Sequence, residues 1–272
     1  MRRAFLVVLA LMLAGTAQAQ TVQDMRSTIH GEWSAPVPPR RLIGNLYYVG
    51  ARTIASYLIT TPAGHILIDT GTREMIPHVC ASIAKLGFQL RDIKILLSGH
   101  AHYDHVQGHA AMQAATHAKV MALGDDARAL QSGRDLSPLG SEGWDPVKVD
   151  RVLRDGDTVT LGGTTLRATW APGHTPGCTV WSLRVEEQHK PHTVAFMACL
   201  GPNREVQLVG NPRFPHLLDD TLTGLRRLRE LHPDIVLLMH PEGTPEARVD
   251  SNAWPRLLDE VEGDMRARAK ER

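Results

Sequence analysis

Several features are scarce in this chain of 272 residues, and each scarcity argues against a class of protein. Aromatic residues make up only 5%, which argues against the base-stacking surfaces of single-stranded nucleic-acid binders. Neither charge sign is in excess, because 30 Lys and Arg face 29 Asp and Glu, so no attraction to nucleic acid or an anionic membrane is indicated. Three cysteines are too few for a small disulfide scaffold. The remaining composition, with 43% hydrophobic residues, is typical of a globular protein, and the length suits one large domain or two small ones.

Residues 1–19 have the pattern of a secretory signal peptide. Two arginines form a positive start, residues 5–13 form an apolar core, and Ala17-Gln18-Ala19 forms a small-residue cleavage site. The core is too short for a transmembrane anchor, which needs ~20 apolar residues, and no later run is long enough either. We therefore expect an exported, soluble, periplasmic protein whose mature chain begins near Gln20.

Strand and helix patterns follow one another along the rest of the chain without a linker. Residues 20–41 are polar and proline-rich, which indicates an extended N-terminal arm, and we assign residues 42–272 to one domain. Short apolar runs bounded by turn residues predict strands, and apolar residues at helical spacing predict helices. The predicted strands are residues 46–49, 54–60, 65–69, 93–97, 119–122, 157–161, 164–170, 178–185, 193–199 and 235–239, and the predicted helices are residues 75–86, 106–116, 216–231, 252 to the C-terminus and a short one from 125.

This order of elements predicts an α/β protein with two sheets packed face to face and helices outside them. The two halves of the chain have similar content. We place the boundary between them in residues 132–146, a loop rich in Gly, Ser and Pro.

Histidine is abundant, with 14 residues, and its positions point to chemistry. Four potential metal ligands lie within six residues in His100-Ala101-His102-Tyr103-Asp104-His105, directly after the apolar run at residues 93–97. A loop at the end of a strand can turn several such side chains toward one point. Imidazole and carboxylate groups are suitable ligands for zinc, so the motif predicts a metal site rather than a cluster of surface histidines.

Two further histidines have comparable settings. His174 lies in a Gly- and Pro-rich turn after the predicted strand at residues 164–170, and His240 follows the strand at residues 235–239. Functional sites of α/β folds gather at the carboxyl ends of strands. With the first cluster, these two histidines complete six ligands, enough for two zinc ions.

At these residues the sequence resembles the metallo-beta-lactamase superfamily, and most closely the third subclass of the class B beta-lactamases. The matching residues are His100-x-His102-x-Asp104-His105, Gly173-His174-Thr175, His240, Asp69-Thr70-Gly71 and Gly210-Asn211-Pro212. The resemblance implies an αβ/βα four-layer sandwich with the metals at one edge of the two sheets. It also implies one Zn²⁺ on His100, His102 and His174 and a second on Asp104, His105 and His240, with no cysteine in either site.

The chemistry implied is hydrolysis of the β-lactam amide bond in penicillins, cephalosporins and carbapenems, which is an activity that confers antibiotic resistance. A zinc-bound water with its pKa lowered to around 7 supplies hydroxide at neutral pH. Asp104 would be the catalytic residue that orients this nucleophile, and no serine nucleophile is needed. We expect a monomer that acts on a small molecule and binds neither nucleic acid nor, after signal cleavage, a membrane.

Two alternatives stay open. The first is another hydrolase of the superfamily, a lactonase or a thioesterase like glyoxalase II. Such enzymes usually place a metal-bridging aspartate between the last two histidines, whereas no Asp occurs from Val159 to Leu218, and Cys199 or Leu200 stands in that region. The second is a zinc-binding protein without catalysis, although structural zinc sites are usually closed and cysteine-rich. One departure weakens the lactamase assignment, because Leu200 and Pro202 replace serines that can hold the substrate carboxylate in related enzymes.

The last expectation concerns the cysteines. Cys178 and Cys199 flank a predicted hairpin whose tip is near Gln188, at ten and eleven residues from that tip. Adjacent antiparallel strands would bring them within the ~4.4–6.8 Å Cα separation of a disulfide, and export would permit oxidation. We therefore predict this disulfide and a free, buried Cys80. The competing interpretation makes Cys199 a thiolate ligand of the second zinc.

Overall fold

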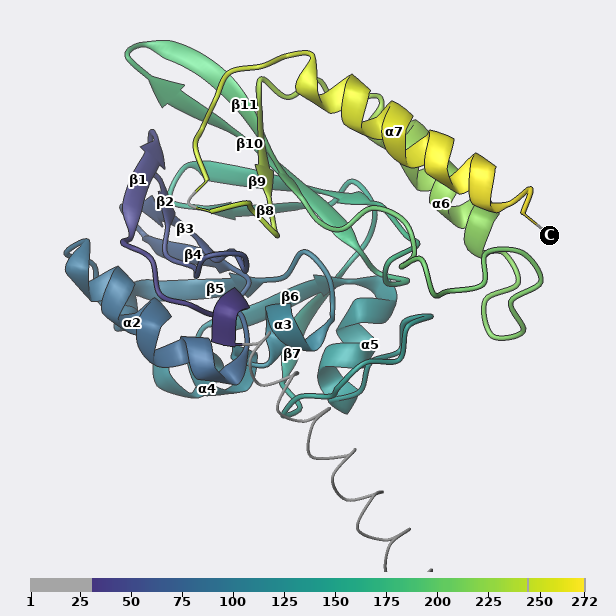
Figure 1. Cartoon of the computed structure of the whole chain (residues 1–272). Helices are drawn as coiled ribbons and strands as arrows, with labels where there is room; N and C mark the ends of the chain where they lie inside the picture. The colour runs from purple at the N-terminus through teal and green to yellow at the C-terminus, as the bar shows by residue number, and fades with distance from the viewer. Residues whose placement is uncertain (1–30, 244, 272) are drawn as a thin grey trace, which may run out of the picture.

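The structure is a computed structural model that describes residues 31–243 and 245–271 (Figure 1). The predicted signal peptide and the first part of the predicted arm lie outside the described residues. The described part of the arm packs along the domain, because Pro36 forms an antiparallel bridge with Ala51 and the Thr53 N–H donates to the Trp33 carbonyl. Among the described residues, no helix has both the length and the apolar character to cross a membrane.

The first sheet has seven strands in chain order, antiparallel from β1 to β4 and parallel from β4 to β7. Its central strands β4 and β5 are rich in isoleucine and leucine and are buried except for Lys94, as a sheet covered on both faces requires. The strands are β1 (Arg40–Ile43), β2 (Leu46–Tyr48), β3 (Tyr57–Thr61), β4 (Gly64–Ile68), β5 (Ile93–Leu97), β6 (Lys119–Leu123) and β7 (Val149–Leu153).

The second sheet has five strands in the order β12-β11-β10-β9-β8. Strands β8 to β11 form an antiparallel meander, and β12 joins it parallel to β11. The strands are β8 (Thr158–Leu161), β9 (Thr164–Trp170), β10 (Thr179–Glu187), β11 (Lys190–Met197) and β12 (Ile235–Leu238).

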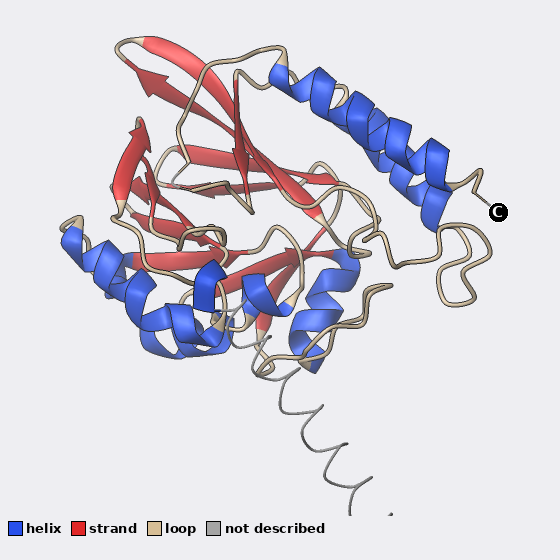
Figure 2. Cartoon of the chain, in the orientation of Figure 1, coloured by secondary structure: helices blue, strands red, loops and turns tan. Residues whose placement is uncertain are grey.

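Helices cover the outer face of each sheet (Figures 1 and 2). On the first sheet these are α2 (Ile76–Lys85), α3 (Tyr103–Val106), α4 (His109–Thr116) and α5 (Gly124–Ser132), and on the second they are α6 (Leu217–Leu228) and α7 (Ala253–Arg268). Short 3-10 turns, η1 (Arg73–Met75) and η2 (Leu90–Asp92), precede α2 and β5. This arrangement confirms the predicted αβ/βα sandwich.

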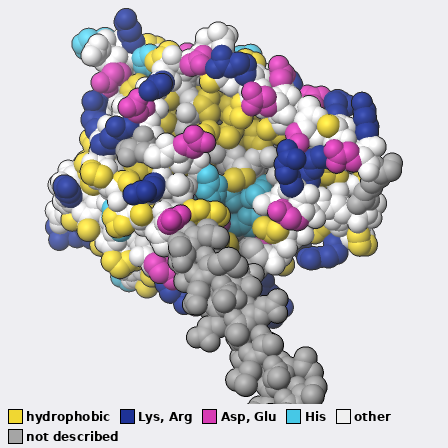
Figure 3. Space-filling model, in the orientation of Figure 1, with side chains coloured by type: hydrophobic (Ala, Val, Ile, Leu, Met, Phe, Trp, Pro, Cys, Tyr) yellow, Lys and Arg dark blue, Asp and Glu magenta, His cyan; other side chains and the backbone are white. Residues whose placement is uncertain are grey.

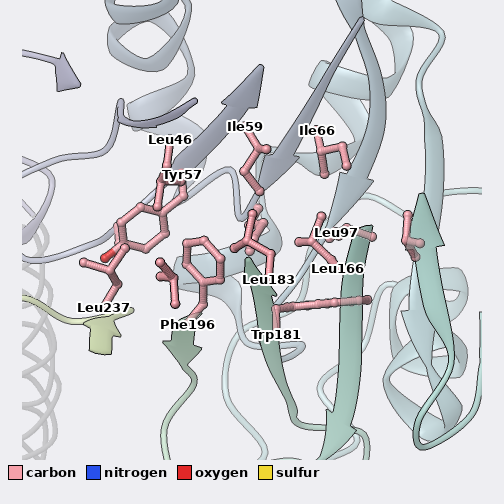
Figure 4. Close-up of a cluster of buried hydrophobic side chains, with 14 of the residues drawn as sticks. Leu46, Tyr57, Ile59, Ile66, Leu97, Leu166, Trp181, Leu183, Phe196 and Leu237 are labelled. Carbon is pink, nitrogen blue, oxygen red and sulfur yellow. The ribbon is translucent and has the colours of Figure 1, made fainter. Parts of the chain in front are cut away.

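Three apolar layers hold the sandwich together. The largest lies between the sheets and contains Tyr57, Trp181 and Phe196 (Figure 4). A second layer packs the helices of the first half against their sheet, and a third seats α6 and α7 on the second sheet through residues such as Trp254. The metal-ligand motifs therefore follow strands whose inward residues, such as Leu97, Ala168 and Leu237, are anchored in the layer between the sheets, which fixes the positions of the segments that follow them.

The boundary predicted in residues 132–146 is wrong. Strand β7 follows that loop and pairs in parallel with β6, so the first sheet ends after Leu153. Neither β7 nor β1 was predicted, and both are edge strands that carry charged residues. Charged side chains on edge strands discourage pairing with other chains, and they also remove the apolar alternation by which a strand is recognised in a sequence.

Candidate metal centre

The predicted ligands lie at one end of the sandwich, on segments that follow strands of both sheets. His100 and His102 lie on the loop after β5, and Asp104 and His105 lie on the short helix α3 that follows this loop. His174 follows β9, and His240 follows β12. Figure 3 shows histidine side chains grouped in the middle of one face of the molecule. The face-to-face packing of the sheets thus brings together residues separated by up to 140 positions in the chain.

The first group consists of His100, His102 and His174. One ring nitrogen of each lies within 4.8 Å of the others, and the ring centroids are 4.5–4.9 Å apart. Burial lowers the pKa of all three, that of His174 to about 3. The imidazoles are therefore neutral at physiological pH, which is the form that binds a metal ion.

The surroundings of His100 show whether a cation fits beside the first group of histidines. It is 1% exposed, and neither ring nitrogen has a hydrogen-bond partner. A buried polar atom without a partner costs about 1–3 kcal/mol, and a metal ion removes that cost by taking the free lone pair. His100 also lies within 4.8 Å of Asp104 and His105 through their ligand atoms, so the two groups of ligands adjoin one another at this residue.

The second group consists of Asp104, His105 and His240. Asp104 Oδ2 lies 3.4 Å from His105 Nε2 and 3.3 Å from His240 Nε2, and the two Nε2 atoms are 3.0 Å apart. Ligand atoms on one tetrahedral zinc lie about 3.4 Å apart, given Zn–N and Zn–O distances near 2.1 Å. The three donor atoms therefore have the spacing of a metal site.

The charges of the second group also favour a cation. Burial raises the pKa of Asp104, but His105 and His240 beside it outweigh that effect and hold the pKa well below its ordinary value. Burial lowers the pKa of His240, yet Asp104 and Cys199 beside its ring raise it to about 11. Positive charge is thus stabilised between these side chains, and a bound metal ion would supply it.

Three histidines of the centre are oriented through a contact of a second ring nitrogen. His102 Nε2 contacts the Ser137 hydroxyl at 2.9 Å, and His240 Nδ1 donates to the Thr53 carbonyl at 3.0 Å. His105 Nδ1 lies 2.7 Å from Asp69 Oδ2. Such contacts select the nitrogen that faces the metal and fix the plane of the ring.

Two of these partners have no local signal in the sequence. Asp69 belongs to a motif of the superfamily that the sequence resembles, whereas Ser137 and Thr53 belong to no motif. They lie 35 and 187 residues from the histidines they contact. The two histidines of the following helix, His109 and His117, were predicted to be ordinary helix residues. His109 contacts the Thr70 hydroxyl, and His117 is exposed at the end of α4.

A cleft of about 450 Å³ opens onto both ligand groups. Trp33 and Leu139 border it and are 37% and 39% exposed, and the Trp33 ring meets the His240 ring edge-on at 6.2 Å. Among residues 200–204, Asn203 lines this cleft, whereas Leu200, Pro202 and Arg204 line a neighbouring cavity. In residues 200–204, Asn203 is therefore the residue whose polar side chain can contact a molecule bound in this cleft.

The predicted disulfide between Cys178 and Cys199 is wrong, because all three cysteines, which lie in the described part of the chain, are free. The hairpin register does place the two opposite each other, but β10 begins after Cys178 and β11 ends before Cys199. Beyond the paired strands, the Cys178 thiol donates to the Cys199 carbonyl at 3.4 Å, while Cys199 lines the cleft.

Three free thiols per chain are therefore expected. Protein denatured without reductant and treated with a thiol-reactive chromophore should release three equivalents, because Cys80 is also unpaired. A single equivalent would show that the cysteines of the hairpin are bridged after all. The same titration on protein reduced before denaturation provides the reference value.

Comparisons with known proteins agree with this geometry. The family model described as the metallo-beta-lactamase superfamily matches residues 49–240. The chain is similar to the native FEZ-1 metallo-beta-lactamase of Legionella gormanii, with 34% identity, a TM-score of 0.83 and coverage of 88% of this chain and 97% of that one. It is likewise similar to BJP-1, a subclass B3 metallo-beta-lactamase of Bradyrhizobium japonicum, with 34% identity, a TM-score of 0.79 and coverage of 88% and 96%.

Curated relatives match over shorter segments. A probable metallo-hydrolase of Burkholderia pseudomallei is 32% identical over 117 residues, which are 42% of this chain and 38% of that protein. A hydroxyacylglutathione hydrolase of Rhodopseudomonas palustris is 34% identical over 97 residues, which are 36% of this chain and 31% of that protein. The matched segment thus spans only about a third of the length of these relatives.

Proposed function

Given that the chain belongs to the metallo-beta-lactamase superfamily, we propose that it hydrolyses the amide bond of β-lactams with two zinc ions. His100, His102 and His174 would hold one ion, and Asp104, His105 and His240 the other. The chain is a metallo-hydrolase by its family and its ligand cluster. The β-lactam substrate, the number of ions and their identity as zinc are the proposed part.

One observation carries the choice of substrate. Beside His240, where lactonases and thioesterases of this superfamily usually place a bridging aspartate, the cleft is lined by Cys199. The full-length similarity to subclass B3 beta-lactamases supports the same choice. A thioesterase is the second candidate, because curated relatives called hydroxyacylglutathione hydrolases match part of the chain.

When bound, the two ions would supply a hydroxide nucleophile at neutral pH and a Lewis acid for the carbonyl oxygen. The residues of the protein hold the ions and orient the attacking water and the substrate. Asp104, kept ionised by the histidines beside it, can accept a hydrogen bond from the attacking water and so direct its lone pair at the carbonyl carbon. Trp33 and Asn203 border the space that a bicyclic substrate would fill.

Ser137, the serine that contacts a ligand histidine, is not arranged as a nucleophile. Ser137 contacts His102 Nε2, but Asp135 Oδ2 approaches the same nitrogen at 3.6 Å. A catalytic triad needs the carboxylate on the opposite nitrogen of the ring. Ser137 is 1% exposed, and its oxygen already accepts from the N–H groups of Leu139 and Gly140.

The deciding experiment compares substrates on one preparation of the mature chain, purified without chelator. We expect about two zinc ions per chain and turnover of a chromogenic cephalosporin, a penicillin and a carbapenem. A hydroxyacylglutathione thioester and a simple lactone serve as the competing substrates. Turnover of these without any β-lactam hydrolysis would refute the proposed substrate, and a metal content near zero in folded protein would refute the metal centre.

We also propose that the protein acts in the periplasm as a monomer, since residues 1–19 have the signal pattern. Release by osmotic shock with an N-terminus at Gln20 is the expected result, and size-exclusion chromatography checks the mass. Retention of the full-length chain in the cytoplasm would contradict the location.

A further inference from the structure

A buried carboxylate that belongs to neither ligand group lies behind the metal centre. Asp126 is the third residue of α5 and is 2% exposed. Burial raises its pKa to about 6, against the effect of three hydrogen bonds that lower it, so the group is mostly ionised above neutral pH. A charge placed there at such a desolvation cost needs a structural reason.

The hydrogen bonds of Asp126 supply that reason, because they connect two loops that carry ligands. Oδ2 accepts from the Ala101 N–H at 2.8 Å and from the Thr175 hydroxyl at 2.7 Å. Oδ1 accepts from the Gly177 N–H at 2.8 Å. Ala101 stands between two ligand histidines, and Thr175 directly follows the third.

Close packing strengthens this connection. A Cβ built on Gly177 would lie 2.5 Å from the Asp126 nitrogen and 2.5 Å from the Leu123 carbonyl oxygen. The turn that carries His174 therefore rests directly on the first turn of α5, at a distance that only glycine permits. The separation between the two loops is set by this contact as well as by the carboxylate.

We propose that Asp126 is the positioning residue of the first metal site, which holds His100, His102 and His174 at binding distance before metal arrives. The inference rests on the proposed two-zinc centre but not on the β-lactam substrate. Asp69 occupies the corresponding place for the second site, since it contacts His105 and accepts from the Gly99 N–H at 2.8 Å. One buried carboxylate thus contacts a ligand of the second site, and the other joins the loops that carry the ligands of the first site.

Only a carboxylate satisfies all three donors at Asp126. An asparagine keeps one acceptor oxygen, so at least one backbone N–H, of Ala101 or of Gly177, would face the amide NH₂ group without a partner. The two loops would then separate or rotate slightly. Loss of contacts around ligands typically weakens metal binding by ~10–100-fold.

Zinc titration of the metal-free, mature protein tests the inference. Competition with a chromophoric chelator gives the two successive dissociation constants. Asp126→Asn should weaken the constant of the first site by roughly 10–100-fold and leave that of the second within experimental scatter. Asp69→Asn should instead weaken zinc binding at the second site. The two variants together then show which measured dissociation constant belongs to which site. Asp125→Asn is the matched control, because Asp125 is the preceding residue, pairs with Arg128 at the surface and touches neither loop's donors.

Hydrogen exchange on the same metal-free proteins provides a readout that does not depend on activity. The Ala101 and Gly177 amides should exchange faster in Asp126→Asn, while amides of the central strand β5 keep their rates. Thr175→Val, which removes one of the three donors, should show a smaller shift in the same direction if Asp126→Asn does not fold. Unchanged constants in the folded variants, or equal weakening of both sites, would overturn the inference, whereas failure to hydrolyse β-lactams would leave it standing.

Discussion

His102→Ala should lower kcat/KM for β-lactams by at least about a thousandfold, or about 4 kcal/mol of transition-state stabilisation. The reason is that His102 belongs to the group of three imidazoles proposed to hold the first zinc, and two imidazoles alone bind the ion weakly. Without the ion, the nucleophile reverts to an ordinary water, whose pKa lies far above neutral pH. Steady-state kinetics with a chromogenic cephalosporin, measured with a fixed zinc supplement, give the value.

The fold should survive this substitution. His102 contributes to no strand or apolar layer, and its ring contacts Ser137 and the other histidines. Circular dichroism should therefore match the wild type, and zinc content should fall. His232→Ala is the control, because His232 is exposed on the loop before β12. Activity within tenfold of the wild type in the His102 variant would contradict the proposed ligand set.

Exhaustive chelation with EDTA should reduce β-lactam turnover to the background rate, and added zinc should restore it. In contrast, serine-directed inhibitors such as clavulanate should have no effect. This pair of results follows from a centre of six metal ligands in which Ser137, the serine beside His102, is not placed as a nucleophile. Chelated protein should keep its secondary structure, since the layer between the sheets contains none of the six ligands.

The melting temperature of the chelated protein should nevertheless fall, because a metal that binds only the folded state stabilises it by mass action. Rescue by zinc within minutes distinguishes metal loss from irreversible unfolding. Turnover that persists after chelation to below one ion per ten chains would disprove the metal mechanism. Inhibition by clavulanate at stoichiometric concentration would point instead to a covalent serine enzyme.

The position of Asn203 bears on substrate range. Leu200 and Pro202, which replace carboxylate-binding serines, line a cavity next to the cleft and offer no side-chain donor. Asn203 lines both spaces, and its Oδ1 is buried without a partner. Arg204 is paired with Asp264 outside the cleft. Any anchoring of a substrate carboxylate by this segment therefore falls to Asn203 or the backbone.

The sequence by itself determined the elements of the sandwich and the candidate ligands. Strand β5 was predicted with its observed bounds, and the other buried strands within a few residues, because continuous apolar runs are a local property of the chain. The ligand motif was visible for the same reason, since four donors stand within six residues. The edge strands β1 and β7 were missed because charged residues interrupt their apolar pattern.

Only the tertiary structure decided which distant groups meet. Pairing of β7 with β6 moved the boundary between the sheets, and the ends of β10 and β11 left Cys178 and Cys199 unbridged although their register is correct. The carboxylate of Asp126 joins loops 25 and 51 residues away. Such contacts depend on how two sheets and a helix pack in space, and no periodicity within a single segment records that packing.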